Sequence, residues 1–315
     1  MPGPFRSLLI SGRDRVRFLH NFCTADIRGL SAGHATEAFF TDARGRILAH
    51  GYVLMLDQQL QVWLLADDPQ RLQKHLERYI ISEDVILSVP AIADSIAVST
   101  TGLPSLPGLP TVTPGLCGPV TDIPGQATAL CVAWSGQPVC IFCGDADTLA
   151  TLRHAPELQP RLLSDAELSQ LRIAERFPMI GVDLSIEHLA PEAGRNAQAI
   201  SFTKGCYLGQ EPIARIDAIG HVNRSLKRVR LTGLATPASE TGIEPPGSSA
   251  TAAATAAVGA ELLLADGTSA GTITSAAVTA DEASGLAVLR LASLSQITHA
   301  RTTDGRLLPV TLTEG

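Results

Sequence analysis

The sequence has few aromatic residues, few charges and few cysteines, and each shortage excludes a class of protein. Only 4% of its 315 residues are aromatic and 17% are charged, whereas 45% are hydrophobic. This composition is typical of a globular chain rather than a disordered one. The formal charge is −7 and the pI about 5.6, so nothing indicates the basic surface that nucleic-acid binding requires. We expect two or three globular domains and no nucleic-acid partner.

Long apolar runs are also missing. No stretch reaches the length of a membrane span, and the apolar run at Leu8-Leu9-Ile10 is too short for a signal peptide. Six cysteines in a chain of this size are too few for a disulfide scaffold. We therefore expect a protein of the reducing cytoplasm with no membrane partner.

Against this background, residues 200–215 concentrate chemically active side chains: a lysine, a cysteine, a glutamine, a glutamate and an arginine among two glycines. We interpret Ile200 to Phe202 as the end of a strand. Gly205 and Gly209 indicate tight turns because glycine has no Cβ, and Pro212 fits the first turn of a helix. The pattern predicts a strand, a turn that carries Cys206, and a short helix.

Cys206 is the candidate functional thiol of this stretch. A thiol that precedes a helix lies at the positive end of the helix dipole, and Lys204 adds positive charge if its side chain turns the same way. Both effects favour the thiolate, which is the nucleophile and the metal ligand. We therefore predict catalytic roles for Cys206 and Lys204. The alternative is a buried cysteine that packs as a small hydrophobe.

Helix caps and turn residues predict the remaining elements of an α+β chain. Strands are expected before residue 11, at 39–46 with a turn at 42–45, at 47–56, 60–65 and 85–89, and on both sides of Ser135-Gly136-Gln137. Helices are expected after a cap at Ser11 or Asp14, after Asp67-Asp68-Pro69, at 145–153, and from the capping box Ser164-Asp165-Ala166-Glu167. Residues 101–126 are expected to form a loop.

Two further segments need a choice between interpretations. Cys140 and Cys143 have the C-x-x-C spacing of a zinc site, but no second pair of ligands is in register, so we interpret them as strand residues and expect no metal site. From residue 227 to 315, short strands with turn signals predict a small β-barrel domain. Residues 235–258 are low in complexity and are expected to form a flexible loop.

The stretch around Cys206 resembles a known signature. The residues concerned are Lys204-Gly205-Cys206-Tyr207-Leu208-Gly209-Gln210-Glu211, flanked by Ile200-Ser201-Phe202 and Ala214-Arg215. They are similar to the octapeptide of the YgfZ family. These proteins are relatives of the glycine-cleavage T-protein that bind folate, assist iron–sulfur enzymes and are connected with tRNA modification. The segments at 171–184 and 189–192 and the Asp-Gly…Gly-x-x-Thr-Ser pattern of the C-terminal region also resemble this superfamily.

The resemblance implies a three-lobed, T-protein-like fold. Two intertwined α/β lobes would occupy residues 1–226, the first mainly 1–90 and the second including 127–226, around a central channel for tetrahydrofolate or another folate. A C-terminal β-barrel would follow at 227–315. Folate has a flat pterin with polar edges and an anionic tail, so its site needs amides or carboxylates, an aromatic wall and arginines. The candidates are Gln210 and Glu211 for the edge, Tyr207 or Phe5 for the wall, and Arg172, Arg215 and Arg224 for the tail.

The chain departs from the T-protein pattern at two places. T-proteins have a glutamate where this chain has Ala174, and the adjacent Glu175 is turned about 100° away on a helix. T-proteins also have an acidic pair where this chain has Ala49 and His50. Loss of that carboxylate removes an obvious acid or base for group transfer.

Three hypotheses follow. The first is a folate-binding accessory protein that assembles or repairs iron–sulfur clusters, with iron–sulfur enzymes or assembly proteins as partners and no enzymatic activity of its own. The second is a folate-dependent one-carbon transferase or demethylase, with Asp42 or Asp26 as the nearby carboxylates. The third is a thiol-redox or structural protein that has lost the ligand. In the first, Cys206 acts either by transient cluster ligation shared with a partner or by thiol chemistry, because one thiolate cannot hold a cluster alone.

Overall fold

The computed structural model describes residues 5–90, 94–103, 105–106, 111–120, 125–233, 254–278 and 282–313. Residues 235–253 of the predicted flexible loop lie outside this description, as do parts of the predicted loop at 101–126. Within the described ranges, no helix combines the length and the hydropathy needed to cross a membrane.

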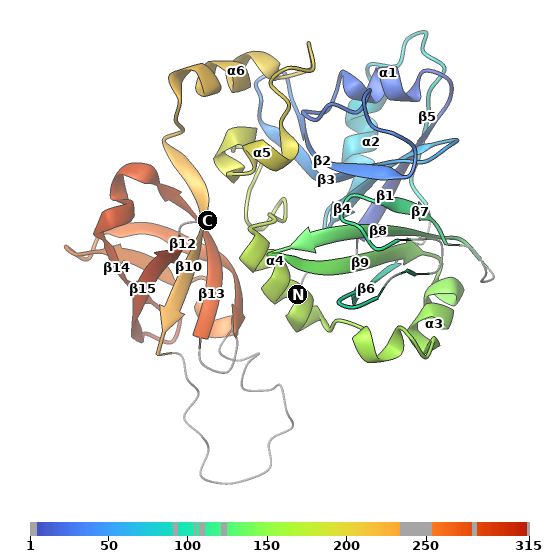
Figure 1. Ribbon diagram of the computed structural model, residues 1–315. Helices are drawn as coiled ribbons and strands as arrows, with labels where there is room; N and C mark the ends of the chain where they lie inside the picture. The colour runs from blue at the N-terminus through green and yellow to red at the C-terminus, as the bar shows by residue number, and fades with distance from the viewer. Residues whose placement is uncertain are drawn as a thin grey trace.

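The first lobe is a five-stranded antiparallel sheet with two helices on one face (Figure 1). Its strand order is β2-β3-β4-β1-β5. The elements are β1 (Phe5–Ser11), α1 (Arg15–His20), β2 (His34–Thr41), β3 (Ile47–Met55), β4 (Leu60–Leu65), α2 (Pro69–Glu77) and β5 (Ile86–Ser88). The predicted hairpin is thus confirmed as β3 and β4, which pair antiparallel.

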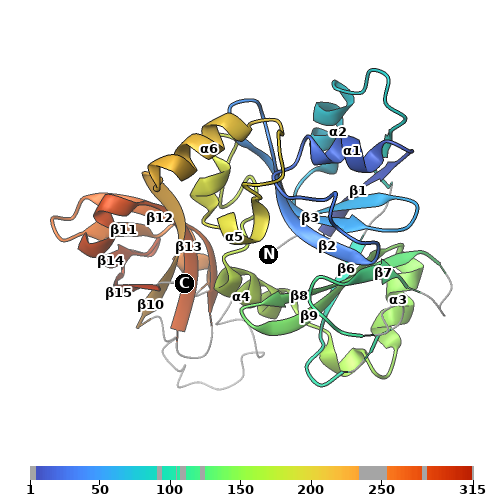
Figure 2. The ribbon, with the colours of Figure 1, turned by 45° about the horizontal axis from the view of Figure 1, so that its top comes forward.

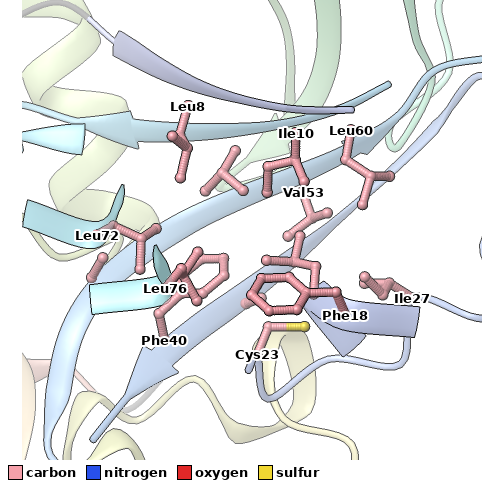
Figure 3. Close-up of a cluster of buried hydrophobic side chains, with 14 of the residues drawn as sticks. Leu8, Ile10, Phe18, Cys23, Ile27, Phe40, Val53, Leu60, Leu72 and Leu76 are labelled. Atoms are coloured by element: carbon pink, nitrogen blue, oxygen red, sulfur yellow. The ribbon is translucent and has the colours of Figure 1, made fainter. Parts of the chain in front are cut away.

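Helix α2 shows how local signals build this lobe. Asp68 caps it by accepting a hydrogen bond from the backbone N–H of Gln70, and Pro69 occupies the first turn, as predicted. Leu72 and Leu76 then lie one turn apart and are buried against the sheet. Figure 3 shows them in the cluster that α1, α2 and the inner face of the sheet enclose.

The second lobe is a four-stranded sheet in the order β6-β9-β8-β7. Its elements are β6 (Asp94–Ser99), β7 (Cys117–Pro119), β8 (Ala127–Trp134), β9 (Gln137–Gly144), α3 (Ala146–His154), η1 (Gln159–Arg161) and α4 (Asp165–Glu175). Asp145 caps α3 and the capping box at Ser164 opens α4, so both predicted helices are confirmed. Cys140 and Cys143 lie on β9, as interpreted. The two sheets pack together through a shared core of aromatic and aliphatic residues.

After α4 the chain returns to the first lobe through η2 (Ala190–Ala193), α5 (Asn196–Ala199) and α6 (Gln210–Ile219). Figures 1 and 2 both show α5 beside β2. The hydroxyl of Thr24 donates to the carbonyl of Ala199 at 2.5 Å, and the N–H of Ser201 donates to the carbonyl of Thr24 at 2.9 Å. The strand predicted at Ile200 to Phe202 is therefore wrong. This segment is a loop, because its backbone bonds go to an irregular turn rather than to a sheet.

The C-terminal region is a closed barrel in the order β10-β13-β12-β11-β14-β15. Its elements are β10 (Arg224–Thr232), β11 (Glu261–Leu264), β12 (Ser269–Val278), β13 (Glu282–Arg290), η3 (Leu291–Gln296), β14 (Ile297–Arg301) and β15 (Leu307–Thr313). Short strands and turn glycines predicted such a barrel, and the structure confirms it. Closure leaves no sheet edge unpaired.

Asp183 joins the second lobe to the barrel. One carboxylate oxygen accepts from Arg172 Nη1 at 2.7 Å and from the N–H of Met179 at 2.9 Å. The other accepts from the hydroxyls of Thr274 and Ser275 on β12, at 2.7 and 2.6 Å. The Asp183 side chain is fully buried. A buried charge is tolerated only when its lone pairs are satisfied, and here four donors satisfy them.

We predict that Asp183→Ala lowers the free energy of unfolding by about 3–5 kcal/mol, because it leaves the Arg172 guanidinium buried without its counter-ion. Urea denaturation followed by circular dichroism measures this loss. Asp94→Ala, which breaks the exposed pair with Arg153, is the matched control and should cost less than about 1 kcal/mol. Equal losses for the two variants would contradict the assigned importance of Asp183.

Candidate functional site

The Cys206 loop rests on the turn between β2 and β3. Gly209 has φ +84°, and a Cβ at this position would lie 2.4 Å from the carbonyl oxygen of Asp42 and 2.5 Å from Thr41 Oγ1. The Thr41 hydroxyl donates to the carbonyl of Leu208 at 2.8 Å. Gly209 is therefore required both for its left-handed backbone and for close contact with the turn.

Helix α6 follows this glycine directly, with Pro212 in its first turn, as the sequence predicted. Gly205 also has a positive φ, of +92°. The turn-then-helix part of the prediction is thus confirmed.

Lys204 lies differently from the expectation. Its ammonium donates to three backbone carbonyls at and after the end of α1, those of His20 at 2.5 Å and of Cys23 and Ala25 at 2.7 Å each. Burial lowers the pKa of Lys204, and the nearby Cys23 and Asp26 partly oppose this effect. Its charge therefore holds the loop after α1 in place, and no hydrogen bond joins it to Cys206 within the part of the chain that the structure describes.

Cys206 is exposed, whereas Cys23, Cys117, Cys131, Cys140 and Cys143 are all buried. The alternative of a buried Cys206 is therefore wrong. The next residue, Tyr207, is buried, and its ring lies under the Lys204 ammonium, 5.1 Å from Nζ to the ring centroid. Burial raises the pKa of Tyr207 to about 12. The loop thus anchors residues 204 and 207 inward and presents the thiol between them to solvent.

The structure brings only some of the predicted ligand residues together. Gln210, Glu211 and Arg215 share α6, where Gln210 is half-buried and the other two are exposed. Tyr207 lies just before them. Arg224, at the start of β10, is half-exposed and pairs with Glu192 at 2.8 Å.

Two of the predicted ligand residues lie elsewhere. Phe5 is 1% exposed and packs between Trp63 and Trp134, with ring centroids 6.2 and 6.4 Å away. It serves the core between the sheets and offers no wall to a ligand. Arg172 is also buried, paired with Asp183 and bonded to the carbonyl of Phe177 at 3.0 Å. Its guanidinium is used within the protein, because α4 buries it at the junction with the barrel.

The candidate carboxylates of the first lobe are turn residues. Asp42 Oδ1 accepts from the N–H groups of Arg44 and Arg46, and Asp26 Oδ1 accepts from the N–H of Arg28. These bonds explain both residues without a catalytic role.

A buried polar network was missed at the sequence level. Glu37 on β2 accepts from His50 Nε2 at 2.7 Å and from both sides of the Arg195 guanidinium, with Nη2 at 2.6 Å. Arg195 also donates to a side-chain oxygen of Glu175 at 3.0 Å. His50 lies between the rings of Phe39 and Phe177, each centroid 4.5 Å away. Pairing of the two predicted strands could have indicated part of this network. In the antiparallel register of β2 and β3, Glu37 lies diagonally opposite His50 on the same face of the sheet.

One large cavity of the part of the chain that the structure describes lies away from these residues. This cavity, of about 910 Å³, is lined by residues of both sheets, among them Ser7, Gln61 and Thr128, but by none of the predicted site residues. The central channel stays a prediction.

We predict that a thiol reagent such as DTNB modifies one cysteine per folded chain. The reason is that Cys206 is exposed and the other five thiols are buried. Absorbance of the released thiolate should show one fast equivalent in buffer and six in denaturant. Cys206→Ser should remove the fast equivalent. A fast phase that persists in this variant would show that a thiol assigned to the core is reachable.

The network at Glu37 also generates a pH prediction. Burial raises the pKa of Glu37, but hydrogen bonds from Arg195 and His50 outweigh burial, so the pKa lies below the ordinary 4.5. The unfolded chain therefore binds the proton more tightly. This contribution to stability is complete above pH 4.5 and is lost as the pH falls through the folded-state pKa.

Urea denaturation between pH 3 and about 6 should give a shallower acid decline in stability for Glu37→Gln than for the wild type. Glu157→Gln, at an exposed position, is the control and should follow the wild type. Parallel curves for Glu37→Gln and the wild type would exclude Glu37 as a source of the acid sensitivity.

Comparison with known proteins identifies relatives of this chain. No protein-family model matches the chain. Two curated relatives, each named "tRNA-modifying protein YgfZ", come from Edwardsiella ictaluri, 28% identical over 225 residues, and Colwellia psychrerythraea, 26% identical over 229 residues. These matches cover 69% and 70% of this chain, and 66% and 68% of the relatives. The chain thus matches about two thirds of the relatives' own length.

The solved structure of glycine cleavage system aminomethyltransferase T from Bartonella henselae superimposes with a TM-score of 0.67, over 98% of this chain and 83% of that one. Sequence identity is 12%, so this likeness shows the fold alone. The resemblance that the octapeptide predicted is confirmed. The chain is a relative of the proteins named YgfZ, built on the mixed α/β fold of the glycine-cleavage aminomethyltransferase with a closed C-terminal barrel.

Proposed function

We propose that this chain is a tetrahydrofolate-binding accessory protein of the cytoplasm that supports the assembly or repair of iron–sulfur clusters. Its partners would be iron–sulfur enzymes, in particular those that modify tRNA, as the name of the relatives indicates. The chain would act through such an enzyme rather than by binding tRNA, because its charge is −7.

The proposal rests mainly on one observation, the exposure of the Cys206 thiol on a loop that is anchored on both sides. Lys204 and Tyr207 are anchored inward on either side of it, and Gly209 seats the loop on the β2–β3 turn. Of the six thiols, only that of Cys206 is exposed. A cluster takes about four thiolates, so a single exposed thiol suits a ligand or a reactant shared with a second protein. It does not suit a cluster held permanently by this chain.

Folate binding rests on the T-protein fold and on the residues that follow the thiol. Gln210 and Glu211 would bind the polar edge of the pterin and Arg215 the anionic tail. The Tyr207 ring is buried under the Lys204 ammonium, so it does not serve as the wall. Gln210, Glu211 and Arg215 all lie on α6, so the helix positions them as one rigid unit.

The likeness to an aminomethyltransferase keeps a one-carbon transferase as the second candidate. That chemistry needs a carboxylate that the substrate can reach. Glu37 is a carboxylate of the first lobe, but it is 6% exposed and bonded to His50 and Arg195, and the rings of Phe39 and Phe177 pack on that His50. This enclosure favours the accessory role.

Titration calorimetry of tetrahydrofolate tests the proposal. We expect binding to the wild type and to Cys206→Ala, because the thiol is not among the folate contacts, and at least tenfold weaker binding to Arg215→Gln, which removes a charged partner of the tail. Arg6→Gln, at an exposed position of β1, is the control and should bind normally. Absence of binding in all four proteins would leave the thiol-redox or structural hypothesis.

The accessory role has its own readout in the same series. In cells that lack the gene, the activity of an iron–sulfur tRNA-modifying enzyme should be restored by the wild type and not by Cys206→Ala. Full restoration by Cys206→Ala would refute the role of the thiol even if folate binds.

A further inference from the structure

The space between the two sheets is filled differently along its length. In one part the rings of Phe5, Trp63 and Trp134 pack together. Ser7 follows two residues after Phe5 on β1, and Gln61 comes two residues before Trp63 on β4. Side chains two positions apart point to the same face of a strand, so both also face the second sheet. These smaller polar side chains do not fill the space, and the cavity of about 910 Å³ lies there.

The second sheet supplies the opposite wall of this cavity. Thr128 on β8 and Cys143 on β9 lie directly opposite each other in the strand register, and both line the cavity. The two walls meet where Gln61 Nε2 donates to Thr128 Oγ1 at 3.2 Å. Ser7, Gln61 and Thr128 are only 5%, 7% and 8% exposed. The fold therefore encloses three polar side chains around one space.

These side chains have hydrogen-bonding capacity that the protein does not use. The Ser7 hydroxyl forms no hydrogen bond with any residue that the structure describes. Gln61 accepts from Trp63 Nε1 at 2.8 Å and donates one amide hydrogen to Thr128, which leaves its second amide hydrogen free. The Thr128 hydroxyl, which accepts that bond, can still donate its own hydrogen. Burial of polar groups without partners is unfavourable, so this arrangement points to an occupant with a polar atom.

The charged residues that line the cavity are both acidic. Asp145 and Asp147 lie at the start of α3. Hydrogen bonds from the N–H of Gln126 and from Thr148 lower the pKa of Asp145 to about 2, so this carboxylate is charged at neutral pH. Asp147 is exposed, and among the described residues no lysine or arginine pairs with it or lines the cavity. This rim attracts cations and repels anions.

The cavity is remote from the Cys206 loop. Its lining includes Leu56 and Gln59, where β3 turns into β4. The Cys206 loop rests on the turn between β2 and β3, at the other end of β3. A strand rises about 3.3 Å per residue, so the nine residues of β3 separate the two places by roughly 30 Å.

We propose that this cavity binds a small organic cation, an amine with an apolar body and an oxygen atom at its far end. The cavity volume lies in the range of about 300–1,000 Å³ that is typical of small-molecule sites. The ammonium group lies near the carboxylates of Asp145 and Asp147, and the apolar body packs on Leu9. The oxygen accepts a hydrogen bond from Ser7 or Gln61. This site does not depend on folate binding or on Cys206.

Three probes of one shape test the preference for a cation. Tyramine, tyrosol and 3-(4-hydroxyphenyl)propionate share a hydroxyphenylethyl body and end in an ammonium, a hydroxyl and a carboxylate. Tyramine should bind with a dissociation constant on the order of 1 mM or below, as expected for about ten non-hydrogen atoms. Tyrosol should bind about threefold more weakly or worse, and the propionate should bind least, because the rim repels it.

The two tryptophans provide a local signal for this titration. The indole N–H of Trp63 donates to Gln61 Oε1, which belongs to the cavity wall. The indole N–H of Trp134 donates to the Tyr52 hydroxyl, outside the cavity lining. In nitrogen-15 NMR spectra, tyramine should therefore move the Trp63 indole signal and leave that of Trp134 nearly unchanged. Trp63→Phe assigns the two signals.

Variants separate the charge of the rim from the polar wall. Asp147→Asn should weaken tyramine binding about threefold or more and leave tyrosol binding unchanged. Asp165→Asn, exposed in the first turn of α4, is the matched control and should bind both as the wild type does. Ser7→Ala should weaken binding of both compounds without lowering the melting temperature, because its hydroxyl has no protein partner to lose.

The proposal is overturned if the wild type binds the three probes equally, or if about 20 mM tyramine leaves the Trp63 signal in place. Equal tyramine affinities for the wild type and Asp147→Asn would also overturn it. Movement of the Trp134 signal alone would place the amine outside this cavity and would overturn it as well.

Discussion

Arg195 holds three segments of the two lobes in one arrangement. Its guanidinium reaches Glu37 on the first sheet and Glu175 at the end of α4, while its backbone opens α5 in the segment that returns from the barrel side. Removing such charges from water is costly, and only near-complete hydrogen bonding offsets that cost. The ion pair therefore forms only if sheet, helix and returning segment are all in place. The main effect of these ion pairs is therefore to specify this arrangement over others, and their net contribution to the free energy of unfolding is smaller.

The signature octapeptide combines two kinds of residue that sequence motifs do not distinguish. Lys204, Tyr207 and Gly209 are architectural: they bind carbonyls, fill the core and permit contact with a turn. Cys206, in contrast, is exposed, and it is the exposed thiol of the segment. The segment thus contains both the residues that fix the loop in place and the thiol that the loop exposes. This explains how a lysine that neighbours a thiol in sequence can be held by a different loop.

Local signals predicted most of the elements. The Asp68 cap, the Ser164 capping box and the barrel turns act within a few residues, so propensity alone identifies them. The segment at Ile200 to Phe202 has the apolar composition of a strand but no sheet edge to join, and only tertiary structure decides that. The network of Glu37, His50 and Arg195 joins residues up to 158 positions apart. Without the fold, no spacing rule could have connected them.

The carbonyls that Lys204 binds have a consequence for how the chain matures on the ribosome. They belong to residues 20–25, and the bonds span 179 to 184 positions. The loop after α1 also receives Thr24's bond to Ala199. The first sheet can pair early, since its strands are neighbours in sequence, but this corner has no partner until about two hundred residues have been synthesised. In the nascent first lobe, the carbonyls of residues 20–25 therefore still lack the Lys204 ammonium as their partner. The segment that completes it is the one that presents Cys206, so the thiol reaches its final setting only when the fold around it closes.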